Sequence, residues 1–226
     1  MTTAIDSKIT AIDWHTLAYH EAWALQKQYF QNLLHEKATQ QFVTKNYLFL
    51  CEHLPVFTLG KSAKMENLLV SETQLTAEDI SLYRVERGGD ITFHGLGQCV
   101  GYPILDLDNF AIGLRQYIFQ VEEVIIRLLA MYDIKADRLV DSTGVWVAGK
   151  RKICALGVKS SRMITMHGFA LNVNTDLHYF DYINPCGIRD KGVTSMAKEL
   201  GKSIDMQALK INLIAIFQTV FNLADE

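Results

Sequence analysis

Three stretches of the chain carry apolar residues at intervals of three or four positions, which is the spacing of an amphipathic helix. They run over residues 17–36, 114–132 and 205–223. We therefore predict three long helices with one buried face each. In the first helix the predicted buried stripe consists of Ala18, Ala22, Leu25, Tyr29 and Leu33.

Shorter stretches rich in β-branched and aromatic residues predict strands. The second helix separates two blocks of strands, so the chain lacks regular βαβ alternation. The predicted fold is α+β, a mixed or antiparallel sheet with helices packed on it. With no repeat or linker, residues 1–226 are predicted to form a single domain. The strands are expected at 47–52, 56–59, 83–86, 98–105, 145–148, 152–158 and 165–174.

Charge and hydropathy exclude several classes of protein. The chain has 22 Lys+Arg against 25 Asp+Glu, a net charge of −3, which argues against nucleic acid as a partner. Hydrophobic residues make up 49 %, enough for a buried core. The uncharged stretch 211–224 is shorter than the ~20 apolar residues of a membrane span, and no signal-peptide pattern opens the chain. We therefore expect a cytoplasmic protein without a membrane partner.

The four cysteines are dispersed and form no CxxC pair, which argues against a disulfide framework or a structural metal site. Cys51, Cys99 and Cys154 lie in predicted strands, where a free cysteine usually acts as a small buried hydrophobe. Cys186 lies instead in the turn sequence Asn-Pro-Cys-Gly, which can present a thiol at a surface. It is the candidate nucleophile.

The segment 87–98 (RGGDITFHGLGQ) carries four of the fourteen glycines of the chain. Glycine allows close approach of the backbone to a ligand, and the neighbouring Arg87 and His94 could hold a carbonyl or an anionic group. A tight β-hairpin with two glycine turns is an equal alternative. The segment is neither a Walker loop nor a GxGxxG motif.

Two later segments also carry candidate chemistry. Lys152 is followed by small and apolar residues, so it could be partly buried and serve as an acid/base with a lowered pKa. Alternation would place Lys152 and Cys154 on one face of the strand and Ile153 on the other. The simpler interpretation is a solvated lysine at a strand start. Gly168, beside His167, could mark close approach of a ligand or of another backbone.

These motifs together resemble one family. In order they are RGGDITFHGLGQ, GYPILDL, GVWV, KICALG, HGFALNV and NPCG. In this order they resemble the bacterial lipoyl(octanoyl) transferases over nearly the whole chain. The sequence departs from the family pattern at Asp90, where Gln is more common, and at Leu96, where Pro is usual.

The resemblance implies the fold of the biotin and lipoate protein ligases. It implies transfer of an octanoyl group from octanoyl-acyl carrier protein to a specific lysine of lipoyl domains. The acceptors would be 2-oxoacid dehydrogenases and the glycine cleavage H protein. Cys186 matches the acyl-thioester nucleophile and Lys152 its acid/base, with no cofactor, ATP or metal. The acyl site would be lined by Arg87, Gly88, Gly89, Asp90, Ile91, Thr92, Phe93, His94, Ala155, Leu156, Gly157, Gly168, Phe169 and Ala170.

A basic segment lies between Asp141 and Asp176, where no acidic residue occurs. Lys150, Arg151, Lys152, Lys159 and Arg162 give it a local charge of +5. Family partners are typically acidic, so this segment could dock both carriers. The alternative is the solvated edge of a hairpin.

Other functions remain possible on the sequence alone. An ATP-dependent lipoate or biotin ligase would share the fold, but it would not need the cysteine of the Asn-Pro-Cys-Gly turn. A non-catalytic lipoyl-domain binder would need neither Lys152 nor Cys186. A thioesterase-like cysteine hydrolase would use water as the acceptor.

Overall fold

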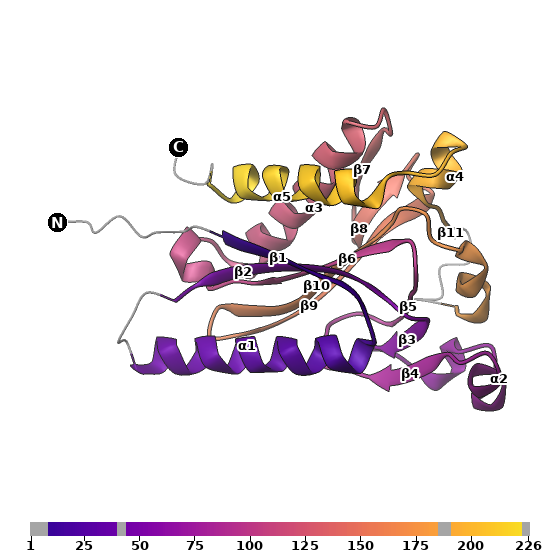
Figure 1. The fold of residues 1–226 in the computed structure, drawn as a ribbon, viewed down its shortest axis with the longest axis horizontal. Helices are drawn as coiled ribbons and strands as arrows, with labels where there is room; N and C mark the ends of the chain where they lie inside the picture. Colours follow the sequence, from indigo (N-terminus) through magenta and orange to yellow (C-terminus); the bar gives the residue numbers. More distant parts are fainter. Residues whose placement is uncertain (1–8, 40–43, 185–190, 223–226) are drawn as a thin grey trace.

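The computed structural model of the protein describes residues 9–39, 44–184 and 191–222. A large sheet forms the middle layer, with α1 on one face and α3 and α5 on the other (Figure 1). In order across this sheet stand β1 (Ile9–Leu17), β2 (Asn46–His53), β6 (Gln98–Ile104), β10 (Ile164–Asn172), β9 (Arg151–Ser161), β8 (Ser142–Val147) and β7 (Ala136–Leu139), and β11 (Gly192–Val193) pairs with β9.

The pairing of the large sheet is mixed, as the sequence predicts. β1 and β2 are parallel and are joined through α1, and β11 is parallel to β9. The pairs from β2 to β7 are antiparallel. Because helices cover both faces, every residue of the central strands β6 and β10 is buried.

A small second sheet adjoins the N-terminal end of α1 (Figure 1). Its order is β4 (Ser81–Arg84), β3 (Val56–Leu59) and β5 (Ile91–His94). It has an apolar cluster of its own, which includes Phe57, Phe93 and Ile183. The glycine-rich segment runs through β5 and thus joins the two sheets. The short elements around this sheet are α2 (Glu72–Ala77), η1 (Met65–Asn67) and η3 (Leu177–Tyr182).

The three predicted long helices are confirmed as α1 (Tyr19–Thr39), α3 (Leu114–Ala130) and α5 (Met206–Asn222). Asp205 caps α5, because its Oδ1 accepts the N–H groups of Gln207 (2.9 Å) and Ala208 (3.2 Å). The shorter elements α4 (Met196–Leu200) and η2 (Leu107–Phe110) complete the fold.

The predicted buried stripe of α1 was partly wrong. Its buried residues are Tyr19, Ala22, Gln26, Phe30 and Leu33. Leu25 and Tyr29 are only half-buried. The sequence pattern misses the true stripe because a glutamine lies in its centre, where the Gln26 amide oxygen accepts the His167 backbone N–H (3.2 Å).

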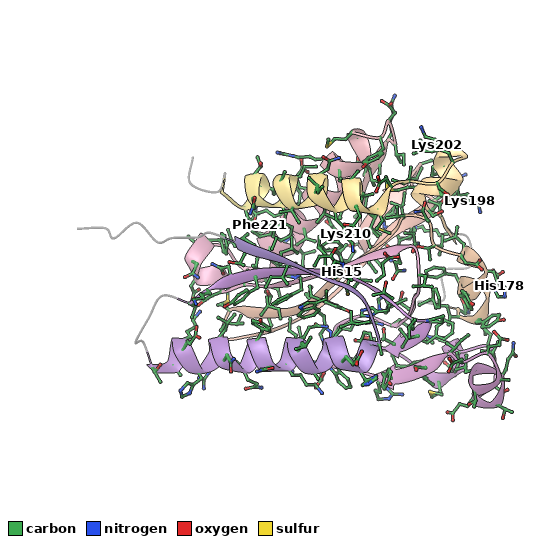
Figure 2. The ribbon with its side chains drawn as sticks, viewed as in Figure 1. His15, His178, Lys198, Lys202, Lys210 and Phe221 are labelled. Carbon is green, nitrogen blue, oxygen red and sulfur yellow. The ribbon has the colours of Figure 1, made fainter. Side chains whose placement is uncertain are left out.

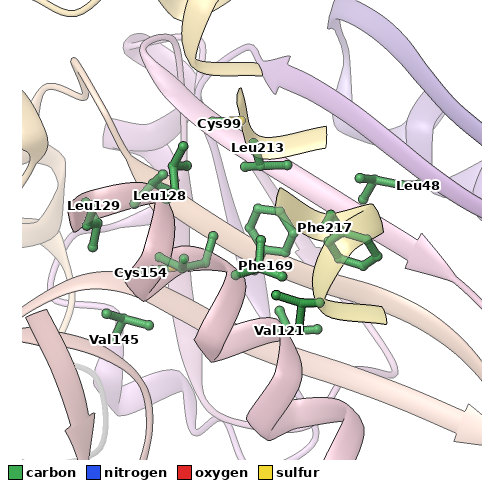
Figure 3. Packing of buried hydrophobic residues seen from close by; sticks show 14 of the residues in the cluster. Leu48, Cys99, Val121, Leu128, Leu129, Val145, Cys154, Phe169, Leu213 and Phe217 are labelled. Atoms are coloured by element: carbon green, nitrogen blue, oxygen red, sulfur yellow. The ribbon is translucent and has the colours of Figure 1, made fainter. Parts of the chain in front are cut away.

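The main core lies between the large sheet and the pair α3 and α5 (Figure 3). Val121 and Leu128 of α3 meet Leu213 and Phe217 of α5 over the strands, with Phe169 between them. A partly buried ion pair attaches α5 to β1, since the Lys210 ammonium lies 3.0 Å from Asp13. Figure 2 labels Lys210 on α5.

Cys51, Cys99 and Cys154 are fully buried, as predicted. Burial raises the pKa of each of these thiols, that of Cys99 to about 12. They are therefore protonated and unreactive at neutral pH.

The seven expected strands are all present, with boundaries that differ by a few residues. The sequence missed β1, β5, β7 and the two-residue β11. β1 and β7 are outer strands that are mostly half-buried or exposed, so they lack a continuous apolar pattern. Across the described ranges no helix is long and apolar enough to cross a membrane.

Candidate active site

A cavity of about 460 Å³ opens on the face of the large sheet that carries α1. Val100, Tyr102 and Ala170 line it and also belong to the apolar cluster beneath α1. The glycine-rich segment and β9 form further parts of its wall. A volume of this size suits a small ligand or an acyl chain.

The structure brings most of the predicted site residues together around this cavity. Gly88 and Phe93 do not line it. Phe93 packs in the core of the small sheet, where its ring stacks on Tyr179 at 4.5 Å between centroids. The predicted residues that line the cavity are Arg87, Gly89, Asp90, Ile91, Thr92, His94, Lys152, Ala155, Leu156, Gly157, Gly168, Phe169 and Ala170.

Several lining residues were not predicted. Gln98, Tyr102, His167 and Asn172 stand inside the motifs that carry the family resemblance, so their signal was present but unused. Tyr19 has no sequence signal beyond its place at the start of α1. The other unpredicted lining residues are Val100, Asp141, Ser142, Thr143, Phe180 and Val193.

The glycine-rich segment packs directly on β9. The Gly88 N–H donates to the Val158 carbonyl (2.9 Å). A Cβ atom on Gly157 would lie 2.9 Å from the Gly88 carbonyl oxygen and 3.0 Å from the Arg87 Cδ. A side chain at 157 would therefore push the segment away from the strand. The glycine at this position serves close backbone packing that forms the cavity wall.

Arg87 is buried and anchors the segment to β3. Its Nη2 donates to the Thr58 carbonyl (2.6 Å) and to Thr58 Oγ1 (2.9 Å), and its Nη1 donates to the Gly88 carbonyl (3.0 Å). Arg87 thus supports the wall as well as lining the cavity.

The two departures from the family pattern have separate settings. Asp90 accepts hydrogen bonds from Asn67 Nδ2 (2.7 Å) and from the Ile91 N–H (2.7 Å). Its carboxylate therefore ties the loop to η1. Leu96 is exposed at the turn between β5 and β6.

Lys152 lies on β9 with its aliphatic chain against Gly144, where a Cβ would come within 3.4 Å of the lysine Cε. Its ammonium lies 4.7 Å from the centre of the Trp146 ring, a cation–π distance. The Lys191 ammonium approaches the same ring at 5.0 Å. Lys152 is half-buried and lines the cavity, so the partly buried lysine predicted from the sequence is confirmed.

The alternation predicted for this strand was wrong. Ile153 and Cys154 are adjacent, yet both lie in the core cluster beneath α3 and α5. The pairing of β8 with β9 shifts register between Val145 and Trp146. A register shift breaks the two-residue period on which the prediction depended.

The histidines at the cavity are neutral. Burial, with Arg87 and His53 nearby, lowers the pKa of His94 to about 3. Burial, with Arg87 nearby, also lowers the pKa of His167 to about 3. His167 has a left-handed backbone (φ +61°), which is uncommon for a residue with a side chain.

Cys186 lies outside the described residues. The described chain on both sides of residues 185–190 is held near the cavity. The Asn184 N–H donates to the Asn67 carbonyl (2.8 Å), and the Gly192 N–H donates to the Lys150 carbonyl (3.0 Å). Val193 pairs with Lys152 and lines the cavity.

The residues of the predicted basic segment have different settings. Arg151 is engaged with Glu199 (2.8 Å). Lys159 lies seven residues along β9 from Lys152, roughly 23 Å at the rise of a strand, and its ammonium is 5.3 Å from the Phe30 ring. Lys150, Arg151 and Lys152 thus stand together at the start of β9, while Lys159 and Arg162 stand near its other end.

A family model described as the lipoyl protein ligase A/B catalytic domain matches residues 18–218. This chain belongs to that family. An octanoyltransferase of Parabacteroides distasonis is 54 % identical over 214 residues, which cover 92 % of this chain and 96 % of the relative. The family resemblance and the acyltransferase class expected from the sequence are therefore confirmed.

Solved structures confirm the expected fold. LipL1 of P. falciparum in complex with lipoate matches with a TM-score of 0.74 at 14 % identity, over 96 % of this chain and 63 % of its own. Lipoate-protein ligase A bound with ATP matches with a TM-score of 0.71 at 14 % identity, over 96 % of this chain and 85 % of its own. The described residues hold no group of three or more His, Cys, Asp or Glu side chains that could bind a metal ion.

Proposed function

We propose that the protein transfers an octanoyl group from octanoyl-acyl carrier protein to a specific lysine of a lipoyl domain, through a thioester on Cys186. The observation that carries this proposal is the meeting of three segments at one cavity. The glycine-rich segment, β9 with Lys152, and β10 all line it, and β11 pairs with β9 at Lys152. Cys186 precedes β11 by six residues.

The first half-reaction moves the acyl group to the enzyme. The Cys186 thiolate attacks the carrier thioester carbonyl, a new C–S bond forms, and the bond to the carrier sulfur breaks. A cation near a thiol favours the thiolate, which is the role proposed for Lys152. Lys152 takes the proton from the thiol and returns it to the departing carrier thiolate.

The second half-reaction forms the amide. The lysine amine of the lipoyl domain attacks the enzyme thioester, Lys152 accepts the amine proton, and the Cys186 sulfur leaves. Thioester exchange is nearly balanced and the amide is more stable, so the sequence of steps needs no nucleotide. Burial of six methylenes of the octanoyl tail at ~0.8 kcal/mol each supplies roughly 5 kcal/mol of recognition.

The setting of Lys152 supports this role. The Trp146 ring attracts the Lys152 ammonium, which lies 4.7 Å from its centre. Burial raises the pKa of the Glu122 carboxyl, and the charge of Lys152 acts in the opposite direction on it. The half-buried position still leaves the ammonium at the cavity.

The partners proposed are acidic carriers, namely acyl carrier protein and the lipoyl domains of 2-oxoacid dehydrogenases and the glycine cleavage H protein. The rival function is an ATP-dependent ligase, because the fold is shared with lipoate-protein ligase A. Cys186 favours the transferase, since an adenylating ligase has no step that needs a thiol nucleophile.

Intact-mass analysis after mixing with octanoyl-carrier protein, without ATP, tests the proposal. We expect one added octanoyl group, removable by neutral hydroxylamine, and its transfer to a lipoyl domain. Cys186→Ser should nearly abolish transfer, while Cys99→Ser, a change at a buried thiol, should retain it. Transfer at the wild-type rate by Cys186→Ser would overturn the mechanism.

A further inference from the structure

Two buried amides stand side by side at the cavity end of the central strands. Gln98 begins β6, Asn172 ends β10, and the two residues pair across the strands. Their exposed fractions are 1 % and 4 %. Buried amides need hydrogen-bond partners, so their contacts define a network inside the fold.

The network begins at the glycine-rich segment. Arg87 Nη2 donates to Thr58 Oγ1 (2.9 Å), and Thr58 Oγ1 lies 3.4 Å from His94 Nε2. His94 Nδ1 lies 2.8 Å from Gln98 Oε1. Gln98 Nε2 then donates to Asn172 Oδ1 (2.9 Å), which brings the network to β10.

Two backbone carbonyls fix the orientation of both amide side chains, and with it the direction of the hydrogen bonds from His94 to Gln98 and from Gln98 to Asn172. Gln98 Nε2 also donates to the Phe93 carbonyl (3.2 Å), and Asn172 Nδ2 donates to the Thr194 carbonyl (3.0 Å). Because a carbonyl can only accept, neither amide can be reversed. Gln98 Oε1 must therefore accept from His94 Nδ1, and His94 Nε2 accepts from Thr58.

The network ends on the strand that carries Lys152. The Thr194 N–H donates to the Lys152 carbonyl (3.0 Å), and Thr194 Oγ1 donates to Glu199 (2.6 Å). Thr194 directly follows β11, which pairs with β9 at Arg151 and Lys152. The side-chain N–H of Asn172 thus joins β10 to this segment, in addition to the backbone bonds that the segment makes to β9.

We propose that Asn172 is a positioning residue, which fixes the 192–194 segment beside Lys152 and so sets the geometry of the acyl-transfer site. The inference rests on the proposed function and adds a residue that acts through its neighbours. Misplacement of reacting groups by about 1 Å costs up to about 100-fold in rate. Loss of the Asn172 donor should therefore slow enzyme acylation more than it changes the KM for the carrier.

Asn172→Asp and Asn172→Leu test the donor directly. The leucine variant lacks a donor at every pH. The buried carboxyl of the aspartate variant has a raised pKa and can donate to the Thr194 carbonyl only while protonated. His94 connects to Asn172 through Gln98, and Arg87 connects to His94 through Thr58. Glu199 connects to Asn172 through Thr194, whose N–H also binds the Lys152 carbonyl, and Arg151 pairs with Glu199. Cys99 follows Gln98 on β6. His94 is neutral across the range used.

Single-turnover acylation of Cys186 by octanoyl-carrier protein is measured from pH 5.5 to 8.5. We expect both variants to be about 10- to 100-fold slower at neutral pH. The ratio of the Asn172→Asp rate to the wild-type rate should fall as the pH rises, whereas the Asn172→Leu ratio should stay flat.

Asn46→Asp is the matched control. Asn46 is also a buried asparagine of the large sheet, on β2, and its Oδ1 accepts the Asp106 N–H (3.0 Å). An aspartate keeps that acceptor, so acylation should remain at the wild-type rate. Wild-type acylation by both Asn172 variants, or a flat ratio for Asn172→Asp, overturns the inference. Failure of the wild-type enzyme to acylate at all overturns the proposed function instead.

Discussion

On one face of the large sheet, α3 and α5 bury a cluster made of aliphatic and aromatic side chains and two thiols. On the other face, α1 shares the surface with a cavity that Tyr, His, Asn and Lys side chains line. The same strands supply both faces, since Leu171 belongs to the core cluster and its neighbour Ala170 to the cluster beneath α1. Stability and chemistry are thus assigned to opposite sides of one sheet, and substitutions should separate them.

The largest separation is expected between Lys152→Ala and Phe217→Ala. Loss of the proposed acid/base should slow enzyme acylation about 10²- to 10⁴-fold. It should change the free energy of unfolding by less than about 1 kcal/mol. Phe217 is fully buried in α5, so its truncation should cost about 3–5 kcal/mol of stability and leave the rate per folded molecule intact. Single-turnover mass measurements and urea unfolding give the two quantities.

Lys152→Arg should restore part of the lost rate, because arginine keeps the charge but does not readily release a proton. Lys150→Ala, a change at the exposed neighbour two positions away, is the control. An Lys152→Ala enzyme that acylates at the wild-type rate would remove lysine from the mechanism.

Acid should destabilise the protein through the cavity face. Burial lowers the pKa of His53 to about 4 and of His94 and His167 to about 3. An unfolded histidine has a pKa of ~6.5, so between these values the unfolded chain binds more protons. Stability should be full above pH 6.5 and fall as the pH is lowered toward 4. Each histidine contributes up to about 1.4 kcal/mol per pH unit.

Urea unfolding at pH 7, 6 and 5 measures this slope. His167→Gln should make the slope shallower, whereas Phe217→Ala should lower stability equally at each pH. A slope that His167→Gln leaves unchanged would contradict a neutral, buried His167.

A smaller difference between the two faces of the sheet is expected from substitutions at two glycines. A Cβ at Gly157 would press on the Gly88 carbonyl at the cavity wall, and a Cβ at Gly101 would press on the Phe169 ring. Gly101→Ala should lower the free energy of unfolding by about 1–3 kcal/mol. Gly157→Ala should mainly weaken acylation and raise the KM for the carrier. Equal effects of both variants on stability and on KM would refute the division between the two faces.

The smallest effect is expected at Trp146. Trp146→Leu removes the ring that holds the Lys152 ammonium, so the thiolate of Cys186 should lose part of its support. The pH midpoint of iodoacetamide labelling should rise by less than about one unit. Trp146→Phe keeps a ring and should retain most of the wild-type midpoint. Identical midpoints in all three proteins would show that the ring has no part in holding the lysine.

The apolar periodicity of the sequence predicted the elements that build the main core. The long helices and the central strands were found because their apolar residues repeat at helical or strand spacing. Outer strands such as β1 were not predicted, because their half-buried positions mix polar and apolar residues. Gln26 was placed outside the buried stripe of α1 because hydropathy does not show that a buried amide can be satisfied by a distant backbone N–H.

The cavity was predicted through motifs, and only in part. Residues such as Arg87 and Lys152 stand out by their chemistry, and the resemblance gave them roles. Tyr19 reaches the cavity from a helix almost 70 residues before the glycine-rich segment, and no local pattern records such a contact. Phe93 was assigned to the cavity because the motif is continuous, but alternation along β5 turns its ring into the small core.

The buried thiols of the core can report transient opening of the folded protein. A thiol such as Cys99, with a pKa of about 12, holds a thiolate fraction on the order of 10⁻⁵ at neutral pH. A labelling reagent therefore reacts with Cys99 and Cys154 only when the core opens. The rate of that labelling measures the population of open molecules, or the opening rate when reagent is abundant. The labelling rates of these two thiols thus measure how often α3 and α5 separate from the sheet.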